Sequence, residues 1–168
     1  ASILSFTHSL SYEVIVVDDA SQDGADELVG HVAGIQVIKS AVNEGFVHSC
    51  NKGARAAKGR FLVFLNNDTQ VLAGWLEPLI EIFSTRSDAG AVGPKVLFPD
   101  GRLQEAGAIV LPNANTSMIG YGEDPAEPRY CVVKKVDYCS GVCLVVEAKS
   151  FGELGGFNVE LAPAYCED

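Results

Sequence analysis

The feature that most constrains this chain is a short apolar run that ends abruptly in polar side chains. Residues 61–65, Phe-Leu-Val-Phe-Leu, are followed at once by residues 66–69, Asn-Asn-Asp-Thr. Such a run predicts a strand buried on both faces of a sheet. Ligands of open α/β sheets bind beyond the carboxyl ends of such strands, where a carboxylate flanked by amides suits Mg²⁺ or Mn²⁺. The same tetrapeptide also suits a turn with Asp68 or Thr69 as a helix cap, so this stretch alone leaves both interpretations open.

A second apolar run of the same kind lies upstream. Residues 14–17, Val-Ile-Val-Val, end in Asp18 and Asp19, and Ser21 or Asp23 can cap a following helix. Further strands are expected over 35–38 and 90–93, and helices over 25–29, 47–57 and 76–83. The alternation of strands and helices with short connections predicts an α/β fold, with a mostly parallel sheet flanked by helices.

The chain changes character after Pro94, where Pro, Gly and Asn divide shorter apolar segments. Strands are expected over 95–97, 107–111, 130–136 and 142–147, with a mobile acidic loop over 112–129 and a short helix and turn over 151–157. This C-terminal half is therefore expected to contribute a small antiparallel portion. No internal repeat or linker divides the 168 residues, so we predict a single domain over 1–168.

Charge, cysteine spacing and hydropathy limit the ligands, metal sites and membrane segments that this chain can have. The net charge of −10 and the lack of a basic stripe argue against nucleic acid, and an acidic protein that binds a phosphorylated ligand needs a cation or backbone amides. The five cysteines show no CxxC spacing, which favours reduced thiols in the cytoplasm over a disulfide framework or a zinc site. No apolar run reaches the roughly 18–20 residues of a membrane span.

The two acidic strand ends are expected to meet. One strand and two helices separate Asp19 from Asp68, which brings both acidic clusters to the same edge of a parallel sheet. Carboxylates that converge in this way need a cation or a ligand rich in hydrogen-bond donors.

These residues, in this order, resemble the inverting family 2 glycosyltransferases of GT-A fold, in particular their rhamnosyltransferase-like branch. The matching pieces are residues 13–24, 43–46, 51–53, 57–59, 65–69, 92–95, 100–101, 104–107, 140–141, 155–160 and 162–168. The match covers nearly the whole chain, and the ordered set is far more specific than any one motif.

The resemblance implies a role for each position. Asp19 would accept a hydrogen bond from the nucleotide base of a UDP- or dTDP-linked sugar. Asp68 would bind Mg²⁺ or Mn²⁺ at the position of the family's metal motif, and Asp168, with Glu167 beside it, would take the proton from the acceptor hydroxyl. The other implied site residues are Asp18, Ser21, Gly45, Asn51, Asn66 and Asn67 on the donor side, and Ser140 and Gly141 on the acceptor side.

The resemblance also implies a larger enzyme. The family's first strand is missing before residue 1 and its acceptor-side helices are missing after Asp168, so we expect a segment of a longer transferase, inactive alone. Within it, residues 1–94 would form the nucleotide-binding half and 95–168 an incomplete acceptor-side half. The acceptor would be a saccharide or a lipid-linked saccharide, and the domain would lie in the cytoplasm, at the inner face of the membrane, associating with it only through the missing parts.

Three other classes remain open at this point. A non-catalytic fragment that binds nucleotide or carbohydrate fits the same motifs, although an aromatic content of 8% offers no obvious platform for a sugar. A nucleotidyltransferase shares this kind of sheet and metal but normally opens on a Gly-rich phosphate loop. A response-regulator receiver domain has similar acids, but residues 95–168 have no place in that fold.

Overall fold

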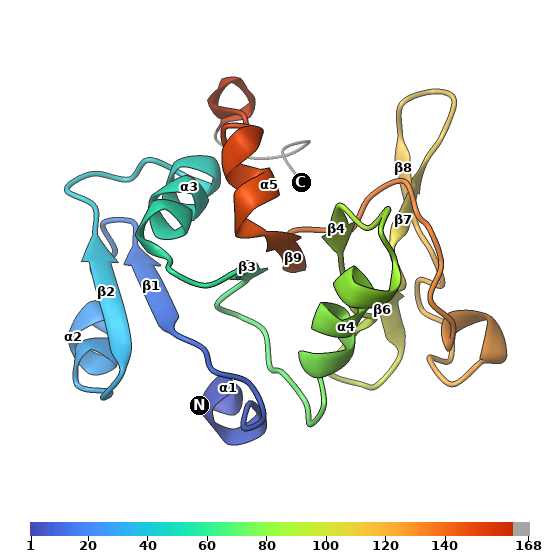
Figure 1. Cartoon of the computed structure of the whole chain (residues 1–168), viewed down its shortest axis with the longest axis horizontal. Helices are drawn as coiled ribbons and strands as arrows, with labels where there is room; N and C mark the ends of the chain where they lie inside the picture. The colour runs from blue at the N-terminus through green and yellow to red at the C-terminus, as the bar shows by residue number, and fades with distance from the viewer. Residues whose placement is uncertain (163–168) are drawn as a thin grey trace. The chain divides into compact units, whose positions relative to one another are not determined.

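The computed structural model describes residues 1–162, without the side chains of Asp26 and Leu28 (Figure 1). The chain divides into two compact units, and each unit is built from two separate segments. Unit 1 consists of Ala1–Thr7 and Val63–Val145, and unit 2 consists of His8–Leu62 and the chain from Val146 onward. The functional halves 1–94 and 95–168 differ from these units and stay a prediction.

Unit 2 is built on two parallel strands, β1 (Val14–Asp18) and β2 (Ile35–Lys39), paired in register along their whole length. Helix α2 (Ala25–Gly30) contacts β2, and α3 (Phe46–Ala56) contacts β1 (Figure 1). The helix α3 approaches the strand closely, since a Cβ on its Gly53 would lie only 3.2 Å from the Val17 side chain. Small residues on α3 therefore allow it to pack on the β-branched strand.

The C-terminal part of unit 2 closes against α3. It contains α5 (Ala148–Glu153) and the 3₁₀-helix η2 (Val159–Leu161). Between them lies Phe157, which is buried and whose ring centroid is 5.0 Å from that of Phe151 and 6.4 Å from that of Phe46. This aromatic cluster ties α3, α5 and the intervening turn into one core.

A three-stranded sheet in the order β3-β9-β4 is formed by Phe61–Leu65, Cys143–Glu147 and Ala91–Val92. The Asn66 N–H donates to the Val142 carbonyl at 3.0 Å, and the Ala148 N–H donates to the Arg60 carbonyl at 2.9 Å. The residue numbers run in opposite directions, so β3 and β9 are antiparallel. Strand β9 is the most buried, with Cys143, Leu144, Val145 and Val146 all in the core.

Two helices and two hairpins complete unit 1. The helices are α1 (Ser2–Phe6) and α4 (Glu77–Thr85), the hairpins pair β5 (Val96–Leu97) with β6 (Leu103–Glu105) and β7 (Ala108–Val110) with β8 (Thr116–Met118), and η1 covers Pro128–Tyr130. Pro78 lies in the first turn of α4, as expected, and the Trp75 Nε1–H donates to Thr7 Oγ1 at 3.0 Å.

The α/β fold class and the strand-helix order up to β4 are confirmed, with differences after Pro94. Strands β1 and β2 pair in parallel, whereas β9 lies antiparallel beside β3. The strand expected over 130–136 is wrong. Valine favours strands mainly where its side chain packs against neighbouring residues of a sheet. Val132 and Val133 are 61% and 60% exposed, so they lack this packing. The loop expected over 112–129 contains β8 and η1.

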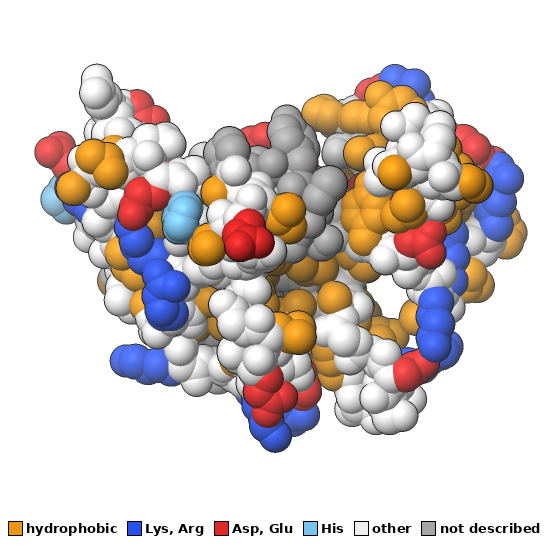
Figure 2. Space-filling view, turned by 90° about the horizontal axis from the view of Figure 1, so that it is seen from above, with side chains coloured by type: hydrophobic (Ala, Val, Ile, Leu, Met, Phe, Trp, Pro, Cys, Tyr) orange, Lys and Arg blue, Asp and Glu red, His pale blue; other side chains and the backbone are white. Residues whose placement is uncertain are grey.

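Charged side chains of both signs lie at several places on the face seen in Figure 2, and some Lys and Arg side chains lie next to acidic ones. Within unit 1, Arg129 pairs with Glu123 and Lys135 pairs with Asp88. Within residues 1–162, no helix is long and apolar enough to span a bilayer.

Gly120 packs against the core of unit 1 at a position where only a glycine fits. Its φ is +78°, and a Cβ would lie 2.4 Å from a methyl group of Leu103 and 2.8 Å from the Tyr130 ring, both of which are buried. We expect Gly120→Ala to lower the free energy of unfolding by about 2–4 kcal/mol, the sum of backbone strain and overpacking. Urea unfolding of both proteins measures this loss.

Gly122→Ala is the matched control, since Gly122 also has a positive φ, +79°, but a Cβ there would meet only Arg102 at 3.7 Å. It should cost about 1–2 kcal/mol from the left-handed backbone alone. Equal losses for the two variants would mean that the crowding at Gly120 has no energetic effect.

Candidate functional site

The donor-side residues of unit 2 gather at the carboxyl end of β1. Asp19, just beyond the strand, accepts from the Gly45 N–H at 2.7 Å and from the Glu44 N–H at 2.9 and 3.1 Å. Asp18 accepts from the Ser21 N–H at 2.9 Å. Asp19 therefore holds the segment that begins α3.

Hydrogen bonding keeps Asp19 ionised. Partial burial raises its pKa, but the backbone N–H groups of Glu44 and Gly45 outweigh this effect, so the pKa lies below the ordinary value of an aspartate. The carboxylate is therefore an acceptor at neutral pH, which is the form required to bind a ligand N–H.

A lysine near Asp19 was missed by the sequence interpretation. Lys52 of α3 donates to Ser40 Oγ at 2.7 Å and forms an ion pair with Glu44. The hydrogen bond from Lys52 lowers the pKa of the Glu44 carboxyl. Glu44 and Lys52 lie inside two of the matching pieces, residues 43–46 and 51–53. They are eight residues apart in the chain, and the sequence alone does not show that their side chains meet.

Asn51 is a buried residue of α3 that binds the backbone of a distant segment. It is 6% exposed, its Nδ2 donates to the Phe157 carbonyl at 2.8 Å, and its Oδ1 accepts from the Phe157 N–H at 2.9 Å. A Cβ on Gly156 would lie 2.5 Å from the same Oδ1, and the φ of Gly156 is +85°. Asn51 thus fastens α3 to the Gly-Gly-Phe turn, and its role beside a nucleoside stays a prediction.

The metal-motif residues of unit 1 form a tight turn after β3. The Asn66 carbonyl accepts from the Thr69 hydroxyl at 2.7 Å and from the Thr69 N–H at 3.3 Å. Asn67 and Asp68 are exposed at the tip of this turn. No hydrogen bond or ion pair of the Asp68 side chain is found in the described part of the chain. Residues 66–69 therefore form a turn, and the Asp68 carboxylate at its tip is accessible to a ligand.

A metal at Asp68 would need ligands beyond the residues that the structure describes. Across residues 1–162, no cluster of three His, Cys, Asp or Glu side chains could hold a metal ion. One carboxylate is still a fitting start, because Mg²⁺ is usually held by one or two carboxylates together with substrate phosphates and water.

On the predicted acceptor side, Ser140 and Gly141 lie directly before β9, and Gly141 is buried. The Ser140 hydroxyl donates to Glu105 Oε1 at 2.7 Å, and Glu105 is only 3% exposed. The Val142 N–H donates to the same hydroxyl at 3.3 Å. The sequence gave Glu105 no role, although it lies inside a matching motif piece, and it anchors the Ser140 segment from β6.

Two of the predictions, the catalytic pair and the meeting of the acidic clusters, remain predictions. Glu167 and Asp168, the expected catalytic residues, lie outside the described residues. Asp19 and Asp68 belong to different units, so the expected meeting of the two acidic clusters stays a prediction.

Comparison with known proteins identifies the class. A family model described as "Glycosyl transferase family 2" matches residues 1–143. The chain therefore belongs to glycosyltransferase family 2. Its fold is the GT-A fold, since a crystal structure of GalNAc-T7 with UDP, GalNAc and Mn²⁺ is similar with a TM-score of 0.73. That likeness covers 99% of this chain and 35% of the other, at 22% identity. A receiver domain and a nucleotidyltransferase are not supported.

Curated relatives are longer proteins. The chain is 28% identical to the O-antigen biosynthesis protein RfbC of Myxococcus xanthus, over 94% of this chain and 13% of the relative. It is 25% identical to the N-acetylglucosaminyl-diphospho-decaprenol L-rhamnosyltransferase of Mycobacterium tuberculosis, over 98% of this chain and 61% of the relative. The chain thus spans less than two thirds of the length of each.

Proposed function

We propose that this chain forms the donor-binding part of an inverting, metal-assisted glycosyltransferase. It would transfer a sugar from a nucleoside diphosphate, UDP or dTDP, to a saccharide or lipid-linked acceptor. The observation that carries the proposal is Asp19, an ionised carboxylate at the end of β1 that the Glu44 and Gly45 amides orient. Such a carboxylate is the kind of acceptor that the N3–H of uracil or thymine requires.

The donor side would work through binding and charge. Asp19 would accept from the base, Asp18 and Ser21 would shape the turn beside it, and Gly45 would border the nucleoside. Asp68, with Asn66 and Asn67 in its turn, would hold the divalent cation. The cation, when bound, would offset the negative charge that develops on the departing diphosphate. A protein of net charge −10 needs a cation or backbone amides to accept a diphosphate, and the proposed cation would meet this need.

On the acceptor side, Ser140 and Gly141 would line the site, and Asp168 beside Glu167 would remove the proton from the attacking hydroxyl. That oxygen would form a bond to the anomeric carbon as the bond to the diphosphate breaks. A single displacement of this kind inverts the anomeric configuration.

Asp68→Ala tests the metal assignment. Calorimetry with UDP and with dTDP, each with and without Mn²⁺, should show that Mn²⁺ strengthens nucleotide binding by the protein. We expect Asp68→Ala to weaken binding in Mn²⁺ by about tenfold or more, because a full negative charge next to the cation is lost. Binding without metal should change little.

Asp88→Ala is the control, since Asp88 is an exposed aspartate of the same unit that pairs only with Lys135 among the contacts described. It should leave nucleotide affinity unchanged. If neither nucleotide binds the unmodified protein, the donor-binding function is wrong. If Asp68→Ala binds as well as the unmodified protein in Mn²⁺, the metal assignment alone is wrong.

A further inference from the structure

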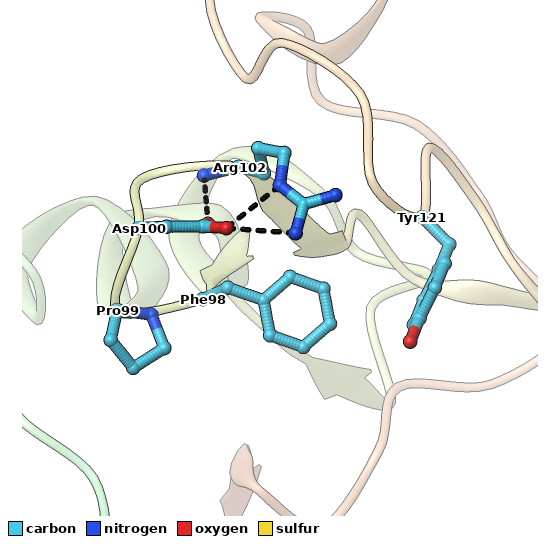
Figure 3. A pocket seen from close by; sticks show the side chains of 5 residues that line it. All are labelled: Phe98, Pro99, Asp100, Arg102 and Tyr121. Carbon is cyan, nitrogen blue, oxygen red and sulfur yellow. Dashed lines mark hydrogen bonds and ion pairs between the residues drawn. The ribbon is translucent and has the colours of Figure 1, made fainter.

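Unit 1 contains a pocket that the donor site does not use. It has a volume of about 320 Å³ and is lined by Phe98, Pro99, Asp100, Arg102 and Tyr121 (Figure 3). This volume lies at the lower end of the range of small-molecule sites, about 300–1,000 Å³. The pocket lies between the β5–β6 turn and the turn that follows β8, so it is contained within one unit.

Two aromatic rings form the apolar part of the pocket. The Phe98 and Tyr121 rings are 5.3 Å apart between centroids and meet at 88° (Figure 3). Tyr121 is 65% exposed, so its ring presents a large face to solvent. The face of an aromatic ring carries partial negative charge, which attracts polarised C–H groups such as those on one face of a pyranose.

A fixed pair of charged groups forms the polar part. Arg102 Nε donates to Asp100 Oδ2 at 2.8 Å, Arg102 Nη2 lies 2.8 Å from the same oxygen, and the Arg102 N–H donates to Oδ1 at 3.0 Å. Together these groups offer N–H donors on Nη1 and free lone pairs on the carboxylate. A sugar hydroxyl both donates and accepts, so adjacent hydroxyls can satisfy both members of the pair.

This charged pair contributes little to folding. The Arg102 and Asp100 side chains are 61% and 51% exposed, and water screens ion pairs in that setting so that they add little to stability. The Arg102 guanidinium lowers the pKa of the Asp100 carboxyl, which therefore stays charged at neutral pH. The pair is thus available for recognition without a large cost in stability.

Backbone bonds hold the two walls of the pocket together. The Phe98 N–H donates to the Arg102 carbonyl at 2.8 Å, which closes the turn between β5 and β6. The Leu103 N–H donates to the Glu123 carbonyl and the Gly122 N–H donates to the Leu103 carbonyl, both at 2.8 Å. Since Leu103 is fully buried, Tyr121 is carried by a turn fixed to the core. A site built in advance loses less entropy when a ligand binds.

We propose that this pocket is a saccharide-binding subsite that takes one ring of a neutral glycan, stacked on Tyr121 and hydrogen-bonded to Asp100 and Arg102. The charges of the pair cancel, so the pocket has no excess positive charge for a phosphate. The polar half disfavours a purely apolar ligand, which would leave the charged groups without compensation. The subsite needs neither nucleotide nor metal and goes beyond the proposed donor binding.

Saturation-transfer NMR on the protein, without nucleotide or metal, tests the subsite. The probes are the methyl glycosides of glucose, galactose, N-acetylglucosamine and rhamnose at millimolar concentration. At least one should receive saturation, strongest on the C–H protons of one ring face. Tyr121→Ala should weaken its binding about three- to tenfold, and Arg102→Leu should also weaken it. Tyr121→Phe should retain the signal, because it keeps the ring.

Tyr12→Ala is the matched control, since Tyr12 is also an exposed tyrosine, 40% accessible, and lies in unit 2. It should leave saccharide binding unchanged. The proposal is overturned if no probe binds, if Tyr121→Ala and Arg102→Leu bind as well as the unmodified protein, or if glucose 6-phosphate binds better than the neutral sugars. A failure of UDP or dTDP to bind would leave this result intact and would count only against the donor site.

Discussion

Replacing Asn51 with leucine is expected to lower the free energy of unfolding by about 2–5 kcal/mol. Leucine branches at the same carbon as asparagine but is larger, so the change removes the two hydrogen bonds to Phe157 and opens no cavity. Both residues are 6% exposed, and water does not readily replace the lost bonds. Each buried backbone group that loses its partner costs about 1–3 kcal/mol.

Urea unfolding followed by circular dichroism measures this loss, and hydrogen exchange of the amides of residues 155–157 locates it. Asn158→Leu is the control, because the Asn158 side chain accepts only an exposed bond from the Glu160 N–H, at 3.0 Å, among the contacts described. It should cost about 1 kcal/mol or less. A loss for Asn51→Leu no greater than that of the control would show that the asparagine does not fasten α3 to the turn.

The sequence predicted the strands that are continuous apolar runs, although in β1 and β3 only Leu62 is buried and the other residues are half-buried. Residues 61–65 form β3 and residues 14–18 form β1, because each is a run of apolar residues that ends in polar ones. Strands β6 and β8 were missed because they lack an apolar run: Leu103 is fully buried between polar neighbours, and all three residues of β8 are exposed. Each pairs with the strand directly before it, β5 or β7, so the hairpin rather than a local apolar pattern forms these short strands.

The site was predicted as a set of residues, and the contacts among them were not. Asp19 was assigned to the base of a nucleotide, but the sequence does not show that Glu44 and Gly45 orient its carboxylate. Asn51 was assigned to the nucleoside, but its partner is a backbone 106 residues away in the chain. The pocket of Phe98 and Tyr121 went unnoticed because only folding brings two separate turns together.

The three acids at the centre of the proposal should separate into two classes of effect. Asp19 and Asp68 would bind the donor, so their loss should reduce nucleotide affinity. Asp168 would act only on the acceptor hydroxyl, which is not present when nucleotide binds alone. A general base typically contributes about 10²–10⁴-fold to the rate, and the amide of asparagine cannot take a proton. The expected signature of Asp168 is therefore a large loss in rate without a loss in nucleotide binding.

Asp168→Asn in the full-length protein should lower the rate of sugar transfer by about 10²–10⁴-fold and leave the affinity for UDP or dTDP in Mn²⁺ unchanged. The rate is measured as release of nucleoside diphosphate from UDP- and dTDP-sugars with saccharide and lipid-linked acceptors. Glu160→Gln, at an exposed acid of the same segment, is the control and should transfer normally. Retained transfer by Asp168→Asn would remove this residue as the base. Because Asp68→Ala acts on binding, that result would leave the metal assignment standing.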